Sequence, residues 1–265
     1  MPVTIPVRID APARAPRKGG LLTVANVQDA PDSHAAFGVE FQSFAMCGEF
    51  GNGLWAAPCA SSSSDLDLMF DDEKQFSGPQ VITGDPFAVY AGVECDLLGS
   101  YGAEARARLE SGEEYTVSRA YAATLAPEFA DSGNSLGTFA PGNTVGAIAA
   151  LEQAAATTYG GLPIIHMAPY LASLAVSQRA AFIDPLTGLL TTGLGTPIAA
   201  GAGYPADRMW ATGEVHIWRT PVRTYDVPDV RTNTAQTLAE RIYVVATDCF
   251  IGFLLQGTAT QGDQS

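Results

Sequence analysis

Apolar residues recur at steps of three and four between Leu97 and Thr124, a spacing that predicts one long helix. The series consists of Leu98, Tyr101, Ala105, Leu109, Val117, Ala120, Tyr121 and Thr124. About twenty-five helical residues span roughly 37 Å, which is long for a chain of 265 residues. Gly99, Gly102 and Gly112 weaken this helix, so we expect it to depend on packing against other elements or other subunits.

Two shorter helices are predicted in the second half of the chain. One runs over about Val145–Tyr159, with Asn143 or Thr144 as its N-cap and Gly160-Gly161 as its end. The segment Leu162–His166 has the pattern of a buried strand. The next helix begins with Pro169 in its first turn and runs to about Ala181.

The strand signals are shorter and are spread over the whole chain. Residues 80–93 alternate in a strand-like way, with a turn predicted at Gly84-Asp85-Pro86. Glu214–Arg219 places Val215 and Ile217 on one face, and residues 233–256 predict one or two long strands. We expect turns and short strands over residues 185–204 and a loop rich in Gly, Pro and Ser over residues 126–143. This mixture indicates an α+β fold without internal repeats.

The first sixty residues differ from the rest. Residues 1–20 are rich in Pro, Ala and Arg and show no hydrophobic period, so we interpret them as an extended arm. Residues 21–60 mix Gly and Pro with aromatic residues that we expect to dock onto another part of the protein: Phe37, Phe41, Phe44, Phe50 and Trp55. Ser61–Ser64 has the composition of a flexible linker.

Charge separates the arm from the body. Apolar residues make up 47% of the chain and charged residues only 16%, which fits either a large core or a surface covered by partners. The net charge is −14, yet four of the fourteen basic residues lie in the first eighteen positions: Arg8, Arg14, Arg17 and Lys18. The body should repel nucleic acid. Only the arm is suited to contact nucleic acid or an acidic partner, the alternative being a solvated tail.

The sequence shows no secretory signal, no membrane-spanning segment and no cysteine motif. Residues 1–20 lack the apolar core of a secretory signal, and the strongest apolar stretch, Cys249–Gln256, is too short to span a membrane. The four cysteines show no CxxC spacing and suggest neither a zinc site nor a disulfide framework. We therefore expect reduced, mostly buried thiols in a protein that assembles inside cells.

One motif resembles that of a hydrolase. Gly133–Gly137 fits the G-x-S-x-G pattern with Ser135 as nucleophile, and Asp184 and His216 would complete a triad. That mechanism needs the serine on a sharp turn between a core strand and a helix, whereas this segment is predicted to be a loop. We therefore rank a serine hydrolase below the two structural hypotheses that are given at the end of this subsection.

Other chemical motifs are missing from the sequence. His34, His166 and His216 have no ligand spacing, and His166 is interpreted as a packed core residue. The acidic run Asp65–Glu73 lacks the glycine of a calcium loop, and no phosphate-binding loop is present. We expect no metal, no cofactor and no catalytic site, and hence a structural protein.

The order of elements carries a resemblance to a known family. It rests on CDLLGSYGAEARARLESGEEYTVSRAYAATLAP (95–127), on TVGAIAALEQAAATTYGGLPIIHMAPYLASLAVSQ (144–178) and on the later strands, which contain Ala239-Glu240-Arg241. Preceded by an arm and a loop, this order resembles the Hong Kong 97-type major capsid fold, which tailed-phage coat proteins share with encapsulin shells. The likeness covers about residues 80–257, and residues 21–60 match no part of it.

The resemblance implies a division of the chain into five parts. These are an N-terminal arm and docking segment (1–60), an extended loop (61–93), a peripheral domain with a long spine helix (94–143), an axial domain (144–225), and returning strands with a tail (226–265).

The resemblance also implies a function. The chain would be a virion coat subunit that assembles in the host cytoplasm, as hexamers and pentamers, into an icosahedral shell around double-stranded DNA. Scaffold, portal or decoration proteins would be further partners, and no membrane is involved. The alternative is an encapsulin-like compartment that holds a cargo enzyme.

Two sets of contact residues follow from the same resemblance. Arg8, Arg14, Arg17 and Lys18 would form an assembly arm, and Lys74 with Asp71, Asp72 and Glu73 would form an extended-loop contact. Some relatives join subunits through a lysine–asparagine isopeptide bond, but we interpret Lys74 as a solvated surface lysine.

Overall fold

The computed structural model describes residues 18–30, 37–43, 47, 78–96, 101–229, 231 and 234–257. In chain order its helices are α1 (Leu21–Val24), α2 (Gly102–Thr124), α3 (Ala126–Ala130), α4 (Thr144–Thr158) and α5 (Pro169–Ser177), with a 3₁₀ turn η2 (Ser132–Asn134).

The strands of the N-terminal half are β1 (Asn26–Asp29), β2 (Val39–Ser43), β3 (Gln80–Gly84), β4 (Pro86–Asp96) and β5 (Ser135–Phe139). They are followed by β6 (Ile164–Met167), β7 (Ala181–Ile183), β8 (Leu190–Thr192), β9 (Ile198–Ala200) and β10 (Arg208–Thr212). The last are β11 (Val215–Arg219), β12 (Arg223–Asp229), β13 (Thr234–Thr247) and β14 (Phe250–Gln256).

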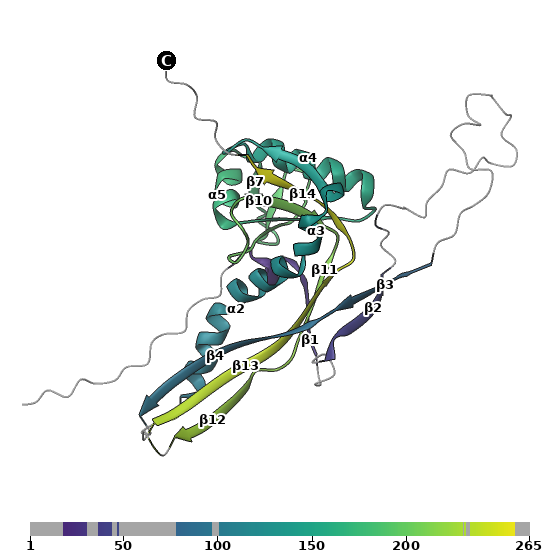
Figure 1. The fold of residues 1–265 in the computed structure, drawn as a ribbon. Helices are drawn as coiled ribbons and strands as arrows, with labels where there is room; N and C mark the ends of the chain where they lie inside the picture. Colours follow the sequence, from purple (N-terminus) through teal and green to yellow (C-terminus); the bar gives the residue numbers. More distant parts are fainter. Residues whose placement is uncertain are drawn as a thin grey trace, which may run out of the picture.

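Two five-stranded sheets dominate the molecule (Figure 1). In the first, which we call the long sheet, β13 pairs with β4 along one edge and with β12 and β11 along the other, and β1 adds to β11. The second, which we call the compact sheet, has the order β5-β14-β10-β6-β9. The chain passes from one sheet to the other between β13 and β14, so residues 248 and 249 lie at their junction.

Helix α2 lies along one face of the long sheet (Figure 1). Its buried positions Ala105, Leu109, Glu113, Val117 and Tyr121 are four residues apart, so they form a stripe on one side of the helix. The apolar members meet Val93 and Ala239 at one end of the helix and Tyr243 and Val89 at the other. The predicted dependence of this helix on packing is thereby confirmed, because its apolar stripe is shared between two core clusters that are completed by residues of β4 and β13.

Helices α4 and α5 cover the compact sheet. Of the two predicted caps, Asn143 caps α4, and its side chain accepts a hydrogen bond from the Gly146 N–H, whereas Thr144 is the first helical residue. Strand β6 is buried at all four positions, which confirms the buried strand predicted near Leu162–His166. The core here contains Leu151, Ile165 and Leu171, all fully buried.

Several predicted boundaries were wrong for identifiable reasons. Helix α5 ends at Ser177, well before Ala181, because Arg179 takes the left-handed conformation (φ 60°) and the Ala180 N–H bonds back to the Ala175 carbonyl. Helix α2 begins at Gly102, five residues after the predicted start, and residues 97–100 lie outside the described ranges.

Two loop predictions were also wrong. Residues 126–143 contain α3, η2 and β5, and β5 forms by parallel pairing with β14 although four of its five residues are exposed. No reversal occurs at Gly84-Asp85-Pro86, since β3 and β4 follow one another in one direction (Figure 1). A Cβ atom on Gly84 would lie 2.6 Å from Cγ1 of Val244, so this glycine allows close packing and makes no turn.

Candidate interaction surfaces

The residues of the hydrolase hypothesis do not form a triad. Ser135 is exposed at the start of β5, after a 3₁₀ turn, and its hydroxyl accepts from the Gly137 N–H at 3.3 Å. The Asp184 carboxylate accepts from the Leu186 N–H and the Thr187 hydroxyl. His216 lies on β11 in the other sheet, against Phe41 and Trp218. Each side chain has its own partners, so the motif is a feature of an exposed edge strand.

His166 is a structural residue, as predicted. Its ring is fully buried and lies between the Tyr204 hydroxyl at 3.0 Å from Nδ1 and the Thr212 hydroxyl at 2.9 Å from Nε2. The ring also stacks on Trp210, with centroids 5.2 Å apart. Burial lowers the pKa of His166 to about 3, so the imidazole is neutral at physiological pH.

Two buried glutamates on α2 carry contacts that the sequence pattern did not reveal. Glu113 accepts from the Arg241 guanidinium at 2.9 Å, with both side chains largely buried. Burial raises the pKa of Glu113, against the opposing effect of the Arg241 charge. Arg241 belongs to the Ala239-Glu240-Arg241 run of the resemblance, and the structure shows that this arginine ties the long sheet to α2.

Glu114, the next residue, holds the beginning of the described chain. Its two carboxylate oxygens accept from the backbone N–H groups of Leu21 and Leu22 at 2.8 and 2.9 Å. N–H groups in the first turn of a helix have no acceptor within the helix, and here the Glu114 carboxylate supplies one. Gly20 is required beside them, because a Cβ there would lie 2.1 Å from the Glu114 carboxyl carbon. The point at which the arm leaves the body is therefore fixed against α2.

A disulfide joins Cys47 to Cys249, 202 positions apart, and it overturns the prediction that these cysteines are reduced. Residue 47 also forms an isolated bridge with Tyr159 at the end of α4. The pairing was not predictable from spacing, because only the fold brings residue 47 to the junction between the two sheets. Cys59 and the side chain of Cys95 lie outside the described part of the chain.

A buried carboxyl lies beside this disulfide. Asp248 is 6% exposed, and its Oδ2 accepts from the Tyr159 hydroxyl at 2.9 Å. Burial raises the pKa of Asp248, against the lowering effect of the Tyr159 hydrogen bond. Gly213 lies directly against Asp248, because a Cβ there would be 2.1 Å from its Oδ1.

Strands β2 and β3 pair antiparallel and form a two-stranded ribbon that projects from the body (Figure 1). Phe41 packs this ribbon onto β11, with its ring 5.0 Å from His216 and 5.4 Å from Trp218. The predicted docking of an aromatic residue from this region is thus confirmed for Phe41, whereas Phe37 is 87% exposed.

The predicted contact residues fall mostly outside the described ranges. This applies to Arg8, Arg14 and Arg17 in the arm and to Asp71, Asp72, Glu73 and Lys74 in the loop. Lys18 is described and exposed, and the next residue, Gly19, accepts a backbone hydrogen bond from Ala200 at 2.8 Å. The roles of both sets therefore stay predictions, as do the five proposed parts of the chain.

One face of the long sheet is covered by no described element and exposes tyrosine and valine side chains, which the pairing register places beside the charged residues Glu240 and Arg223. On β4, Val89 and Val93 point toward α2, whereas Tyr90 points the opposite way and is 72% exposed. Leu238 on β13 is paired with Tyr225 on β12, which is also on this side and exposed. We call the surface made by Tyr90, Leu238, Tyr225 and Val227 the outer sheet face.

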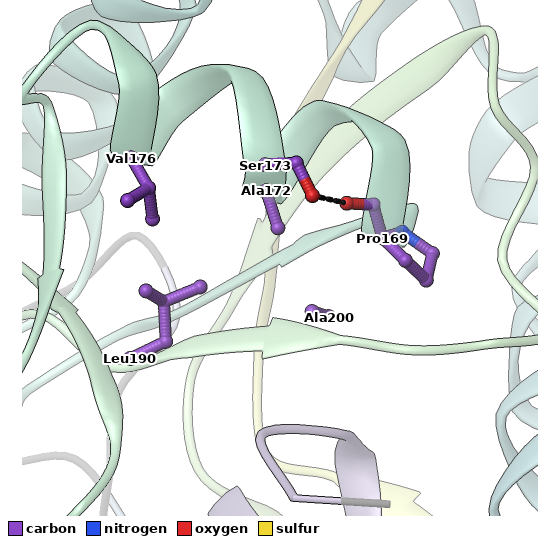
Figure 2. A pocket seen from close by; sticks show the side chains of 6 residues that line it. All are labelled: Pro169, Ala172, Ser173, Val176, Leu190 and Ala200. Carbon is purple, nitrogen blue, oxygen red and sulfur yellow. Dashed lines mark hydrogen bonds between the residues drawn. The ribbon is translucent and has the colours of Figure 1, made fainter.

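A second apolar surface lies beside α5. A groove of about 310 Å³ opens between this helix and strands β8 and β9 (Figure 2). It is lined by Pro169, Ala172, Ser173, Val176, Leu190 and Ala200, none of them charged. The Ser173 hydroxyl donates to the Pro169 carbonyl at 2.9 Å, so the one polar side chain among them is already bonded (Figure 2).

The described ranges contain neither a cluster of metal ligands nor a membrane-spanning helix. No three potential metal-ligating side chains come together there. Among the same residues, no helix combines the length and apolar character needed to cross a membrane.

The fold resembles those of several solved structures over nearly its whole length. The capsid of a native GTA particle matches with a TM-score of 0.54 at 14% identity, covering 96% of this chain and 98% of the other. Microbacterium phage Oxtober96 gives 0.53 at 10% identity, covering 96% and 95%. A virus-like particle from Pyrococcus furiosus gives 0.50 at 11% identity, covering 91% and 93%.

Sequence comparison finds no such likeness, since no family model and no curated protein matches the chain. The three-dimensional match is therefore independent of sequence similarity. It confirms the predicted α+β class, and it shows that the chain has the fold of phage-type capsid subunits, the Hong Kong 97-type fold.

Proposed function

We propose that this chain is the coat subunit of a closed capsid shell that encloses double-stranded DNA. The observation that carries the proposal is the match with the GTA capsid subunit, which spans 96% of this chain and 98% of that one. The absence of a triad around Ser135, Asp184 and His216 in the described residues agrees with a structural role.

The exposed apolar surfaces support self-assembly. A shell is built from many copies of one surface, and each contact can be weak because one subunit makes several at once. The outer sheet face provides aromatic and aliphatic side chains that no element of the described residues covers. Aromatic side chains are enriched at such interfaces. We assign this face to contacts between neighbouring subunits.

Nucleic acid contact is assigned to the arm. Arg8, Arg14, Arg17 and Lys18 are concentrated at one end of a chain whose net charge is −14. An acidic body keeps packaged DNA from adhering to the shell wall, whereas a basic arm binds phosphates without sequence preference. Assembly in the host cytoplasm, and contacts with scaffold, portal or decoration proteins, belong to the same proposal.

Electron microscopy of the purified full-length chain tests the proposal. We expect closed hollow particles in negative stain and a fast-sedimenting species in the ultracentrifuge. The double variant Tyr90→Lys/Leu238→Lys should abolish both, because it places charges on the outer sheet face. Tyr115→Lys, at a tyrosine that is 51% exposed on α2, is the matched control and should assemble.

Two results would contradict the proposal in different ways. A wild-type chain that stays a monomer under all assembly conditions overturns the shell function itself. Particles that form equally well in the double variant overturn only the assignment of the outer sheet face. Particles isolated from the natural host with a protein cargo in place of nuclease-protected DNA would favour the encapsulin-like alternative.

A further inference from the structure

The Cys47–Cys249 bond is a covalent link between the β2–β3 ribbon and the body of the protein. Residue 47 lies four positions after the end of β2 at Ser43, in a ribbon that projects from the body (Figure 1). Cys249 lies at the junction of the two sheets and is only 3% exposed. The bond therefore fastens a projecting ribbon to the centre of the fold.

Non-covalent contacts hold the ribbon lightly. Of the five residues of β2, only Ser43 is buried, and of the five residues of β3, only Gly84 is buried. The aromatic contact to β11 consists of Phe41 against His216 and Trp218. Segments that bury few residues open locally at a low cost in free energy. Whether the bond is formed therefore decides how firmly the ribbon is held.

Both cysteines are positioned by backbone contacts that do not require the bond. Residue 47 forms a β-bridge with Tyr159. The Cys249 carbonyl accepts from the Gly213 N–H at 2.8 Å and from the Thr247 hydroxyl at 3.3 Å. The Cα atoms of the two cysteines are 5.2 Å apart, within the usual range for a disulfide. A folded chain with two reduced thiols therefore keeps the pair in position to bond.

A capsid shell passes through two redox environments. Under the proposed function the chain assembles in a cytoplasm, where cellular thiols keep cysteines reduced, and the released particle meets an oxidising medium. We propose that Cys47 and Cys249 form a redox latch, which is open while subunits assemble and closes after the particle leaves the cell. The latch rests on the proposed function, because it requires a particle that moves between these environments.

The latch closes by exchange with a small disulfide such as oxidised glutathione. Cys47 is partly exposed and Cys249 is buried, so the Cys47 thiolate attacks first. A mixed disulfide forms, and the released glutathione thiolate takes up the proton that Cys47 lost. The Cys249 thiolate then attacks Sγ of Cys47 and expels the second glutathione thiolate, which takes up the proton from Cys249. Each protein bond thus reduces one small disulfide to two thiols.

Thiol trapping at two stages tests the latch. Particles of the full-length chain are recovered from the producing cells without air, and one portion is exposed to oxidised glutathione. Both portions are quenched in acid and alkylated with N-ethylmaleimide in denaturant. Peptide mass spectrometry should find Cys47 and Cys249 alkylated in the untreated portion and joined in the treated one.

Thermal unfolding of the same two portions measures what closure does. The closed particles should unfold at a temperature roughly 10 °C higher, because a bond between residues 202 positions apart constrains the unfolded chain. Cys47→Ser particles should show no shift with oxidised glutathione. Cys59→Ser, which retains both partners of the bond, is the matched control and should show the full shift. Wild-type chain assembled with dithiothreitol tests the open state without any substitution and should form the same particles.

The outcomes separate the latch from the shell function. Absence of particles from the wild-type chain under every condition overturns the shell function and the latch with it. Three results overturn the latch and leave the shell intact: a pair already joined inside the cells, particles that form only after oxidation, and a transition temperature that closure does not raise. An equal shift in Cys47→Ser would also overturn the latch, because oxidation would then act at another site.

Discussion

The two sheets bury their apolar surface in different ways. In the compact sheet, β6 and β9 are buried at every position, and α4 and α5 complete the core within one chain. In the long sheet, α2 covers one face and the opposite face exposes Tyr90 and Tyr225. The compact sheet is thus covered by helices of its own chain, whereas the long sheet has one face that no described element covers.

Buried polar groups show the same difference. The compact sheet contains a neutral histidine, His166, which is satisfied by two hydroxyl groups. Under the long sheet lies an ion pair, Glu113–Arg241, which fixes the lateral position of α2 on the strands. Removing either partner of a buried ion pair leaves an uncompensated charge. The contact between α2 and the long sheet therefore combines apolar packing with a charged pair, whereas the buried histidine of the compact sheet is neutral.

Loss of the Cys47–Cys249 bond should have the largest effect on stability, because it ties residue 47 to the junction of the two sheets. A cross-link between residues 202 positions apart removes much freedom from the unfolded chain. Cys47→Ser should lower the free energy of unfolding by about 4 kcal/mol. Urea unfolding of the unassembled chain measures this.

The control for that experiment is Cys59→Ser, a cysteine that takes no part in the bond. It should unfold at the wild-type urea concentration. Treating the wild type with a reductant should reproduce the effect of Cys47→Ser. Equal midpoints for oxidised and reduced wild type would show that the bond does not stabilise the fold.

Truncating one side chain in the compact core and one on the outer sheet face should give opposite results. Leu151→Ala, at a fully buried residue of the compact core, should cost about 3 kcal/mol of stability because it leaves a cavity. Tyr90→Ala, on the outer sheet face, should change stability by less than about 0.5 kcal/mol and yet reduce particle yield. Calorimetry of unassembled chains and sedimentation of assembly mixtures measure the two effects. Similar stability losses at both positions would remove the distinction.

The smallest effect is expected from Asp248→Asn at the junction of the sheets. Burial raises the pKa of Asp248 above the ordinary value of 3.8. Its protonated form is thus favoured by folding. This contribution to stability is fully present below pH 3.8 and is lost as the pH rises through the raised pKa of the folded state.

Asparagine cannot ionise and still offers an oxygen to the Tyr159 hydroxyl. The variant should therefore lose the part of the pH dependence that Asp248 contributes above pH 3.8. Unfolding curves at several pH values measure this difference. Asp226→Asn, at an exposed carboxyl on β12, is the control. Parallel pH profiles for wild type and Asp248→Asn would show that burial does not favour the protonated carboxyl.

The sequence by itself determined those helices and strands that are marked by patterns of neighbouring residues. The recurrence from Ala105 to Tyr121 predicted α2, and the alternation of Val215 and Ile217 predicted the buried face of β11. The capping signal at residues 143 and 144 predicted where α4 begins. The order of these elements was enough to indicate the fold. Such features depend on neighbours a few residues away, which the sequence displays directly.

Contacts between distant residues were decided only by the tertiary structure. The Cys47–Cys249 bond, the Glu113–Arg241 ion pair and the parallel pairing of β5 with β14 each join segments about 115 residues apart or more. No short-range sequence pattern indicates which residues form these pairs, because the pairs depend on how the two sheets pack together. The same applies to the uncovered outer sheet face, since a strand's alternation shows that it has two faces but not which one remains open.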